Sequence, residues 1–451
     1  MKRVQTPLAL TIAGSDPSGG AGIQADVKTF SALEVEGRSV IAALTAQNST
    51  GVVETFGLSE GIVSSQIKAV FEDGKPDSIK TGMLGDAETV RATARLLKKY
   101  RVKNLIVDPV MRSTSGATLL SSEGVTAVKE KLLPLALLVT PNIKEAETLA
   151  GIKIKNMKDR LEAACIIREL GVKAVLITGG HGKGDAVDLL FDGKESVEFS
   201  SPRLTSDEVH GTGCVFSAAI TGELAKGQSL KNAVACAKEF VSLAIQFRST
   251  SGVGLAHAEP MAKLYREKER YELLQRTHAC IDLMKGQGVG RLIPEVQSNL
   301  AVAIDRARVL DDVIGFPGRI TKLGDDFAIS APPRFGGSRH VADIVLTAMN
   351  FDPTKRAVMN IKYEPEIIKI CQKLKLTIAS FDRAKEPRKV KLKEGSSLEW
   401  GTANAIKSFG GKVPDIIFDE GGMRKEEMIR VIANDIETLT ERILKIAKLY
   451  P

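Results

Sequence analysis

The chain has 451 residues, of which 43% are hydrophobic and 26% are charged, and its net charge is +8. This length exceeds what one ordinary hydrophobic core supports, so we expect two or more domains. No apolar run approaches the ~18 residues of a membrane span and no signal-peptide pattern opens the chain, which argues against a membrane or secreted protein.

The first predicted element is a buried strand, because residues 8–13 form a short apolar run. The glycine-rich segment GSDPSGGAG follows at 14–22, and a helix is predicted after it. Residues 20–25 formally match a dinucleotide fingerprint, but four residues separate the strand from its glycines, and that fingerprint needs a tight turn there. The chain has no Walker A sequence either, so we expect nucleotide phosphates to be held by another device.

An alternation of strands and helices continues along the first half of the chain. Apolar runs occupy residues 104–107, 135–139 and 172–177, and helix-like stretches occupy residues 87–100, 121–131 and 157–171. The alternation predicts an α/β fold with a mostly parallel sheet and helices on both faces. Ligands of such sheets bind at the carboxyl ends of the strands, and Asp108, Asn142 and Gly179 each follow an apolar run.

The segment HGTGC at 210–214 precedes the apolar run 215–220 and predicts a glycine turn that opens a helix. The glycines allow a ligand to approach the backbone, and the helix start carries a partial positive charge, which together suit a phosphate or an oxyanion. Cys214 is placed in the first turn, where the helix field favours its thiolate. The alternative is an ordinary turn with a buried, inert cysteine.

Seven motifs in this order resemble the hydroxymethylpyrimidine/phosphomethylpyrimidine kinases of thiamin biosynthesis. They are the 13–26 segment, AQN at 46–48, KTGML at 80–84, DPVM at 108–111, TPN at 140–142 with Glu145, GGH at 179–181 and HGTGC at 210–214. The resemblance covers about residues 5–255. It implies a ribokinase-like fold and a kinase reaction that uses ATP and Mg²⁺.

The resemblance also implies roles for individual residues. Gln47 is expected to pair with the polar edge of the pyrimidine, and the other expected substrate-binding residues are Gly14, Asp26, Met83 and Val110. The expected nucleotide-binding residues are Asn142, Thr178, Gly180, Gly211, Thr212, Gly213 and Lys238. Asp108 and Glu145 are expected to organise Mg²⁺, and Cys214 to act as the catalytic base.

Structural explanations compete with several of these roles. Met83 and Val110 suit a plain core, Gln47 suits a strand-end amide, and Glu145 suits the charge at a helix start. Thr178 stands where close bacterial relatives have a lysine near the ATP phosphates. Lys238 is equally well explained as a solvated helix lysine or as a replacement for that charge.

A domain boundary is predicted after Gly254. We expect a kinase domain at 1–258, a connecting helix at 259–285 that carries the first helix of the second domain, and that domain at 286–451. Most of the positive charge lies after residue 260, where 33 Lys and Arg face 26 Asp and Glu. Such a surface suits anionic partners, and phosphorylated small molecules fit better than nucleic acid, because no nucleic-acid-binding motif is present.

The second domain resembles thiamin-phosphate synthase domains that are fused to such kinases. The resemblance rests on VQSN at 296–299, GFPGRI at 315–320, FGGSRHVA at 335–342 and DEGGM at 419–423. It implies a three-layer α/β/α domain similar to class II aldolases. Arg319 and His340 are the expected catalytic residues and Arg339 binds substrate, because guanidinium groups suit pyrophosphate and histidine handles protons near neutral pH. The alternatives are surface charges and a satisfied histidine at a helix start.

The two resemblances together predict a bifunctional enzyme. It would phosphorylate hydroxymethylpyrimidine twice and couple the product with hydroxyethylthiazole phosphate to give thiamin phosphate. The rival hypotheses are a pyridoxal kinase activity and a second domain that senses ligands without catalysis. Five scattered cysteines without CxxC spacing predict a cytoplasmic protein with reduced thiols. We also expect small-molecule substrates, no nucleic-acid or membrane partner, and a homo-oligomer.

Overall fold

The computed structural model describes residues 6–113, 116–179, 184–204, 208–250, 252–387, 390, 396–422 and 425–451. The chain divides into two compact units, Met1–Tyr265 and Arg266–Pro451, and each is described by itself. No helix within these described ranges is both long enough and apolar enough to cross a membrane. The predicted boundaries at 258 and 286 stay a prediction.

The described residues of the first unit form a nine-stranded sheet. In sheet order its strands are β3 (Gly51–Gly57), β2 (Glu36–Asn48), β1 (Leu8–Ser15), β4 (Ser78–Thr81), β5 (Leu105–Val107), β6 (Leu138–Val139), β7 (Ala174–Ile177), β8 (Ala186–Phe191) and β9 (Ser196–Ser201). Neighbours from β2 to β7 run parallel, whereas β3, β8 and β9 run antiparallel to their neighbours. The predicted, mostly parallel sheet is therefore confirmed.

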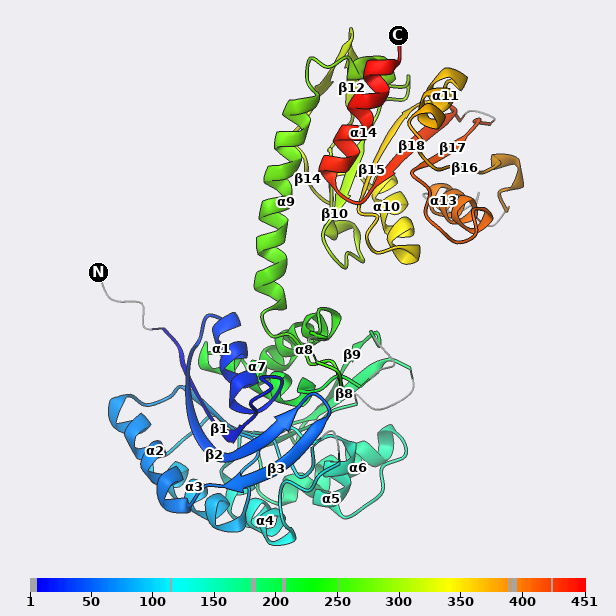
Figure 1. Ribbon diagram of the computed structural model, residues 1–451. Helices are drawn as coiled ribbons and strands as arrows, with labels where there is room; N and C mark the ends of the chain where they lie inside the picture. Colours follow the sequence, from blue (N-terminus) through cyan, green and yellow to red (C-terminus); the bar gives the residue numbers. More distant parts are fainter. Residues whose placement is uncertain are drawn as a thin grey trace. The chain divides into compact units, whose positions relative to one another are not determined.

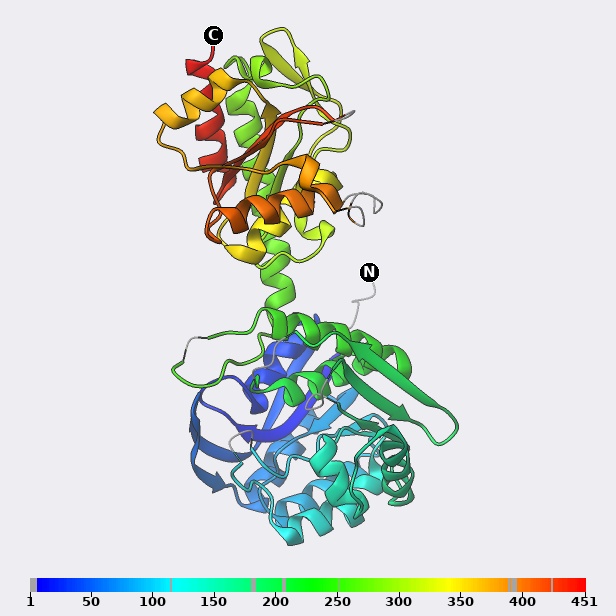
Figure 2. The same ribbon diagram turned by 90° about the vertical axis from the view of Figure 1, so that its right-hand side faces the viewer.

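Helices cover both faces of this sheet (Figures 1 and 2). One face packs against α2 (Glu60–Asp73), α3 (Ala87–Lys99), α4 (Ser122–Ala127), α5 (Ile143–Ala150) and α6 (Met157–Glu169). The other packs against α1 (Gly22–Ala32), α7 (Thr212–Ala225) and α8 (Leu230–Gln246). Successive strand residues alternate between the two cores, so that Leu105 and Val107 face the first and Ile106 the second.

Two predicted elements differ from the observed ones near Pro134. The strand expected at 135–139 is only β6, and it follows the short 3-10 helix η2 (Leu133–Leu135), which has Pro134 in its first turn. The 3-10 turn occupies residues 133–135, so pairing with β5 begins only after it, where Leu137 N donates to the carbonyl of Leu105 at 2.8 Å. The helix expected at 121–131 is α4 followed by one π-helical turn, η1 (Val128–Leu132).

The described residues of the second unit form a seven-stranded sheet and a separate hairpin. In sheet order the strands are β14 (Arg334–Phe335), β11 (Val313–Gly315), β10 (Leu300–Ala303), β15 (Ala357–Lys362), β18 (Met428–Ala433), β17 (Ile416–Asp419) and β16 (Ile378–Ser380). The hairpin is β12 (Ile320–Leu323) with β13 (Asp326–Ile329). Among these strands, β16 and β17 run parallel and the other neighbours antiparallel.

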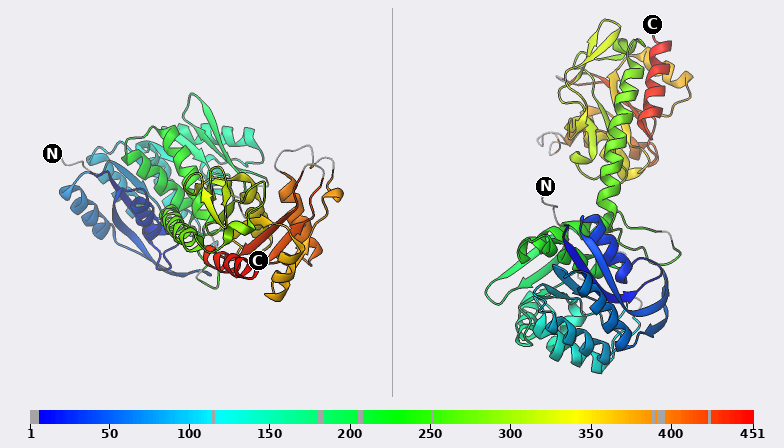
Figure 3. Two further views of the ribbon diagram at one scale, coloured as in Figure 1. Left: turned by 90° about the horizontal axis from the view of Figure 1, so that it is seen from above. Right: turned by 90° about the vertical axis from the view of Figure 1, so that its left-hand side faces the viewer.

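Two helical layers enclose this second sheet (Figures 2 and 3). One contains α9 (Ala262–Met284), α11 (Pro365–Lys373) and α14 (Ile436–Leu449), and the other contains α10 (Arg339–Phe351) and α13 (Ser396–Ser408). Short 3-10 turns are η3 (Val289–Leu292), η4 (Leu310–Asp312) and η5 (Arg383–Lys385). The second half of α9 contributes Leu273 and Met284 to this core, and Arg276 on α9 pairs with Glu437 on α14. The predicted α/β character is confirmed, and the likeness to class II aldolases stays a prediction.

Candidate active sites

The parallel strands of the first unit bring most of the expected kinase residues to one edge of the sheet. Gly14 and Gln47 lie at the carboxyl ends of β1 and β2. Four further residues follow the next strands of the sheet: Met83 after β4, Asp108 after β5, Asn142 after β6 and Thr178 after β7. The first turn of α7 supplies Cys214 beside the same edge, because the sulfur interacts electrostatically with Asp108. The topology alone therefore assembles residues that are far apart in the sequence.

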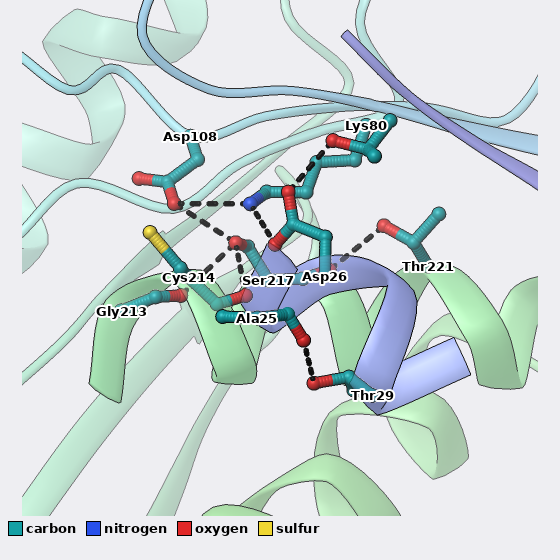
Figure 4. Close-up of polar contacts among 10 residues, drawn as sticks. Ala25, Asp26, Thr29, Lys80, Asp108, Gly213, Cys214, Ser217 and Thr221 are labelled. Carbon is teal, nitrogen blue, oxygen red and sulfur yellow. Dashed lines mark hydrogen bonds and ion pairs between the residues drawn. The ribbon is translucent and has the colours of Figure 1, made fainter. Parts of the chain in front are cut away.

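A buried ion-pair cluster lies among these elements (Figure 4). Lys80 on β4 is fully buried, and its Nζ lies 2.6 Å from Asp26 Oδ1 and 3.9 Å from Asp108 Oδ2. Thr11 Oγ1 donates to the other Asp26 oxygen at 2.6 Å, and Ser217 Oγ donates to Asp108 Oδ2 at 2.9 Å. Both oxygens of Asp26 are thus engaged inside the core, and its expected contact with substrate stays a prediction.

Sequence reasoning assigned no role to Lys80, Thr11 or Ser217. The available signal was a lysine between apolar or β-prone neighbours in the short strand β4, where a charge needs a partner. Burial by itself lowers the pKa of Lys80, but the nearby Asp26 and other negative groups raise it above its ordinary value. Lys80 is therefore positively charged and lies beside Asp108.

Cys214 differs from the expectation of a thiolate. Burial and the charges of Asp108 and Asp26 raise the pKa of its thiol to about 12, although Lys80 acts in the opposite direction. The helix start acts in the favourable direction, but its contribution of about 0.3–1 kcal/mol is smaller than the effect of burial beside two carboxylates. The thiol is protonated near neutral pH.

Asp108 and Glu145 form a second buried pair of acidic groups. The backbone N–H of Asn142 donates to Glu145 Oε2 at 2.9 Å, and the Asn142 side chain accepts from the backbone of Glu145, so the two residues form a capping box at the start of α5. Burial, together with the charge of Asp108, raises the pKa of Glu145 to about 8. Burial also raises the pKa of Asp108.

This donor set fits a divalent cation. Mg²⁺ is held in phosphoryl-transfer sites by one or two carboxylates together with water and phosphate oxygens. The charge of Asp108 raises the pKa of Glu145, and a cation bound between these two carboxyl groups would offset that repulsion. Among the described residues no group of three or more His, Cys, Asp or Glu side chains converges on one point, so the fit rests on the pair alone.

Gln47 contacts a histidine in this structure. Its Nε2 lies 2.9 Å from His210 Nε2, and that same ring nitrogen lies 3.5 Å from Asp16 Oδ2. The small pocket beside it is lined by Ser113 together with Asn48 and other residues around the β2–β3 turn. Gln47 is therefore oriented by His210, a contact that sequence reasoning missed although it named both residues.

The other expected substrate residues also lie at this edge. A Cβ added to Gly14 would stand 3.1 Å from the sulfur of Met83, so these two positions adjoin each other directly. Met83 is buried and Val110 is half-buried, and Val110 lines a small pocket with Asp108. The contact places Gly14 beside Met83, and a substrate-binding role for these two residues and for Val110 stays a prediction.

The start of α7 has the features of an anion site. Its first residue is preceded by Gly211, which has φ +79° and provides no side-chain cap, and Thr212 and Gly213 in the first turn are partly or fully exposed. A Cβ at Gly211 would lie 1.8 Å from the carbonyl oxygen of Gly20, so the two glycine-rich loops are in direct backbone contact. The open N–H groups of this turn suit phosphate oxygens.

The remaining nucleotide-site residues are distributed differently. Gly180 and His181 lie outside the described residues. The backbone N–H of Thr178 donates to Pro141, and Gly179 N donates to Asp188 Oδ1 at 2.8 Å. Lys238 is buried rather than solvated, because its Nζ lies 2.7 Å from Asp188 Oδ2 and also donates to Ala186. Its charge is already paired, so its contact with a nucleotide stays a prediction.

In the second unit, one edge of the sheet collects the expected synthase residues. Arg319 follows β11, is exposed, and donates from Nη1 to the carbonyl of Val296 at 2.8 Å. Arg339 and His340 are exposed in the first turn of α10. A Cβ on Gly315 would meet Ser338 at 2.8 Å, so the loops before Arg319 and before α10 touch each other at this edge.

Sequence reasoning missed a buried triad at the same edge. Asp419, at the end of β17, accepts from Arg383 Nε at 2.5 Å and from Arg430 Nη1 at 2.8 Å. The Asp419 and Arg430 side chains are at most 2% exposed, and that of Arg383 is 12% exposed. The DEGGM motif pointed to Asp419, but its partners lie 36 residues before it and 11 after it.

Comparisons with known proteins cover both units. Residues 16–260 match the family model described as phosphomethylpyrimidine kinase, and residues 277–445 match the model described as thiamine-phosphate synthase ThiN. The chain is 48% identical over 246 residues to the thiamine biosynthesis bifunctional protein ThiED of Geobacter sulfurreducens, an alignment that spans 54% of this chain and 50% of that protein.

Two further proteins match this chain over nearly all of their own length. The bifunctional thiamine biosynthesis protein ThiDN of Methanocaldococcus jannaschii is 36% identical over 446 residues, which is 98% of each chain. Pyridoxal kinase of Bacillus subtilis, solved as an ADP complex, has a TM-score of 0.54 and 37% identity, and the match covers 58% of this chain and all of that one. The first unit thus has the expected ribokinase-like fold. The chain belongs to the family of bifunctional thiamin-biosynthesis proteins in which a phosphomethylpyrimidine kinase is joined to a ThiN-type thiamine-phosphate synthase.

Proposed function

We propose that this chain catalyses three successive steps of thiamin biosynthesis. The first unit phosphorylates hydroxymethylpyrimidine to the monophosphate and then to the pyrophosphate, with ATP as the donor. The second unit joins that pyrophosphate to hydroxyethylthiazole phosphate, giving thiamin phosphate and inorganic pyrophosphate. The observation that carries this proposal is the match to both family models, in the order of a relative aligned over 98% of this chain.

At the kinase site, the first turn of α7 is the proposed phosphate cradle. The preceding Gly211 provides no side-chain cap for the N–H groups of Thr212, Gly213 and Cys214. N–H groups at a helix start bind anions such as phosphate. Phosphoryl transfer depends chiefly on positioning and on stabilising the charge of the transferred group. We assign the Sγ of Cys214, in its thiolate form, as the acceptor of the hydroxymethyl proton, because it lies in the first turn of α7 and interacts electrostatically with Lys80.

Mg²⁺ is the proposed cation of this site, with Asp108 and Glu145 as its protein partners, directly or through water. When bound, it would neutralise charge on the nucleotide phosphates. The carboxylates that raise the pKa of Cys214 would then be offset by a cation, which would lower the pKa of the thiol and so supply the thiolate form that can accept a proton. Lys80 and Ser217 both contact Oδ2 of Asp108, which leaves Oδ1 of this carboxylate for the cation.

Gln47 is the proposed reader of the pyrimidine ring. The amide is aimed by His210, which in turn faces Asp16, so its orientation is fixed before substrate binds. Leaving a buried amide or ring nitrogen without a partner costs about 1–3 kcal/mol, which is enough to distinguish between ring systems. Gly14 and Met83 would give the ring its apolar walls.

At the synthase site, Arg319 and His340 are the proposed catalytic residues. Breaking the bond between the pyrimidine methylene and the diphosphate oxygen leaves negative charge on the departing pyrophosphate, and fixed cationic donors stabilise that charge. Both side chains are exposed at the edge where the two glycine-containing loops meet. Arg339 beside them would contact the second phosphorylated substrate.

The deciding experiment uses the purified full chain with hydroxymethylpyrimidine, hydroxyethylthiazole phosphate, ATP and Mg²⁺. Thiamin phosphate should form, and omitting ATP should abolish it unless the pyrimidine pyrophosphate is supplied. Cys214→Ala should lower kinase turnover by about 10²-fold, the scale of a lost general base, and spare coupling of supplied pyrophosphate. A wild-type protein that makes no thiamin phosphate from the two phosphorylated substrates would refute the synthase assignment.

A second candidate activity is phosphorylation of pyridoxal, because the Bacillus subtilis neighbour is a pyridoxal kinase. Comparing kcat/KM for pyridoxal and for hydroxymethylpyrimidine decides between the two, and we expect the pyrimidine to be preferred. We also propose a cytoplasmic location, because all five cysteines are free. The expected homo-oligomer stays a prediction.

A further inference from the structure

The Arg383–Asp419–Arg430 triad carries one more positive charge than negative. Arg383 donates to both Asp419 oxygens, at 2.5 and 3.2 Å, and Arg430 donates to Oδ2 of the same carboxylate at 2.8 Å. Asp419 is the one carboxylate that pairs with either arginine within the described part of the chain. Two guanidinium groups therefore share one carboxylate in a site from which water is largely excluded.

Stability alone does not explain such an arrangement. Removing charges from water is costly, and replacing a buried Arg–acid–Arg triad by apolar side chains is often neutral or stabilising. Burial lowers the pKa of Arg430, because removing its charge from water is unfavourable. An uncompensated positive charge here has a use if an anion binds beside it.

Arg383 is the member of the triad that can meet a ligand. Its side chain keeps 12% of its surface exposed, whereas Arg430 keeps 2%. Its Nε and Nη2 bind Asp419, and its Nη1 has no hydrogen-bond partner among the residues that the structure describes. The ring of Phe381 lies 5.6 Å from the guanidinium carbon and helps to fix its position.

The position of Arg383 suits the coupling reaction. It follows β16, and Asp419 ends β17, which runs parallel to β16, so both lie at one edge of the sheet. β17, β18, β15, β10 and β11 are successive antiparallel neighbours, and the registers place the end of β11, which leads to Arg319, at this same edge. Glu420 and Glu427 on the neighbouring loop are exposed, so water screens their charges.

We propose that Arg383, held by Asp419 and Arg430, is an anion subsite that takes a phosphate or diphosphate group in the second unit. This inference rests on the proposed synthase function. Asp419 and Arg430 are positioning residues, and Arg383 contacts the anion through Nη1. The shared chemistry is a phosphate ester, and either the pyrimidine pyrophosphate or the thiazole phosphate supplies it.

The test measures binding of inorganic pyrophosphate to the full chain by calorimetry, together with KM for each phosphorylated substrate. Arg383→Gln should raise the Kd for pyrophosphate at least about 10-fold, because it removes a charge-assisted hydrogen bond. It should raise KM for one of the two substrates by a similar factor, and the affected substrate identifies the source of the phosphate. Arg383→Lys, which keeps the charge without the planar fork, should give a smaller increase.

Arg442→Gln is the matched control. Arg442 pairs with Asp415 at 2.7 Å, with side-chain exposures of 19% and 16%, and Asp415 precedes β17 at the opposite end of the sheet. This variant should leave pyrophosphate affinity and both KM values unchanged. A lowered affinity in Arg442→Gln equal to that in Arg383→Gln would overturn the proposal, because it would show a general loss of stability.

Two further outcomes separate this inference from the proposed function. If wild-type protein forms thiamin phosphate and both Arg383 variants keep its affinity and KM values, the subsite is refuted and the synthase function stands. If wild-type protein forms none but binds pyrophosphate in an Arg383-dependent way, the subsite stands and the synthase function fails.

Discussion

Replacing Lys80 with methionine tests the buried cluster of the kinase unit. Methionine keeps most of the volume of the side chain and removes its charge. Asp26, fully buried and 2.6 Å from the ammonium, would then lose its cation, and Asp108 would lose a second contact at 3.9 Å. Removing one partner of a buried ion pair costs about 3–5 kcal/mol, so the free energy of unfolding of this unit should fall by that amount.

The measurement is denaturant unfolding followed by circular dichroism and by tryptophan fluorescence. The one tryptophan of the sequence, Trp400, belongs to α13 in the second unit, so its fluorescence reports on a separate core. Lys80→Met should shift the dichroism transition of the first unit and leave the Trp400 transition in place. Adding Asp26→Asn should restore much of the loss, because the uncompensated charge is then gone.

The exposed pair Lys153–Glu147 provides the control. Its atoms lie 2.8 Å apart, but the Lys153 side chain is 80% exposed, so Lys153→Met should change stability by less than about 1 kcal/mol. If Lys80→Met is as mild as this control, or if Asp26→Asn restores nothing, the reasoning about the buried cluster is refuted.

Three other predictions concern the two sites. The pKa of Glu145 is near 8 in the folded state and 4.5 ordinarily, so between these pH values the folded protein holds a proton that the unfolded chain releases, and stability falls as pH rises from about 4.5 to 8. Glu145→Gln should reduce that fall in unfolding experiments at pH 5 and pH 8. An unchanged pH dependence would contradict the assignment. Gln47→Leu should lower kcat/KM for hydroxymethylpyrimidine by about 10-fold or more, which is about 1.4 kcal/mol, with little change in KM for ATP; equal losses for both substrates would indicate misfolding instead. Arg319→Ala and His340→Ala should each slow thiamin phosphate formation by at least about 10²-fold in a coupled assay and leave pyrimidine phosphorylation intact; near-normal coupling would remove the two from the site.

The sequence was sufficient where the pattern is local. The parallel sheet followed from alternating apolar and helical stretches, and the polar residues after β5, β6 and β7 followed from their place at strand ends. Partners at long range were beyond it: Lys80 reaches back 54 residues to Asp26, and Arg383 reaches forward 36 residues to Asp419. Such pairs are set by strand order and register, which one sequence does not reveal.

Electrostatic properties were equally hard to predict. The position of Cys214 in the first turn of a helix suggested a thiolate, but burial and two neighbouring carboxylates determine its pKa in the opposite direction. A solvated Lys238 was one of the two expected explanations, and its pairing with Asp188 depends on the antiparallel return of β8, which the sequence pattern did not indicate. Local chemistry is visible in a sequence, whereas the dielectric surroundings of a group require the fold.

The backbone contact between Gly20 and Gly211 has a consequence for synthesis of the chain. The two loops are separated by about 190 residues, yet they pack against each other so closely that a Cβ at Gly211 has no room. The phosphate cradle therefore does not exist until α7 has left the ribosome and returned to the loop that was made first. Nascent chains that stop before this helix should retain the early strands and helices but bind no nucleotide, so the kinase becomes competent late in its own translation.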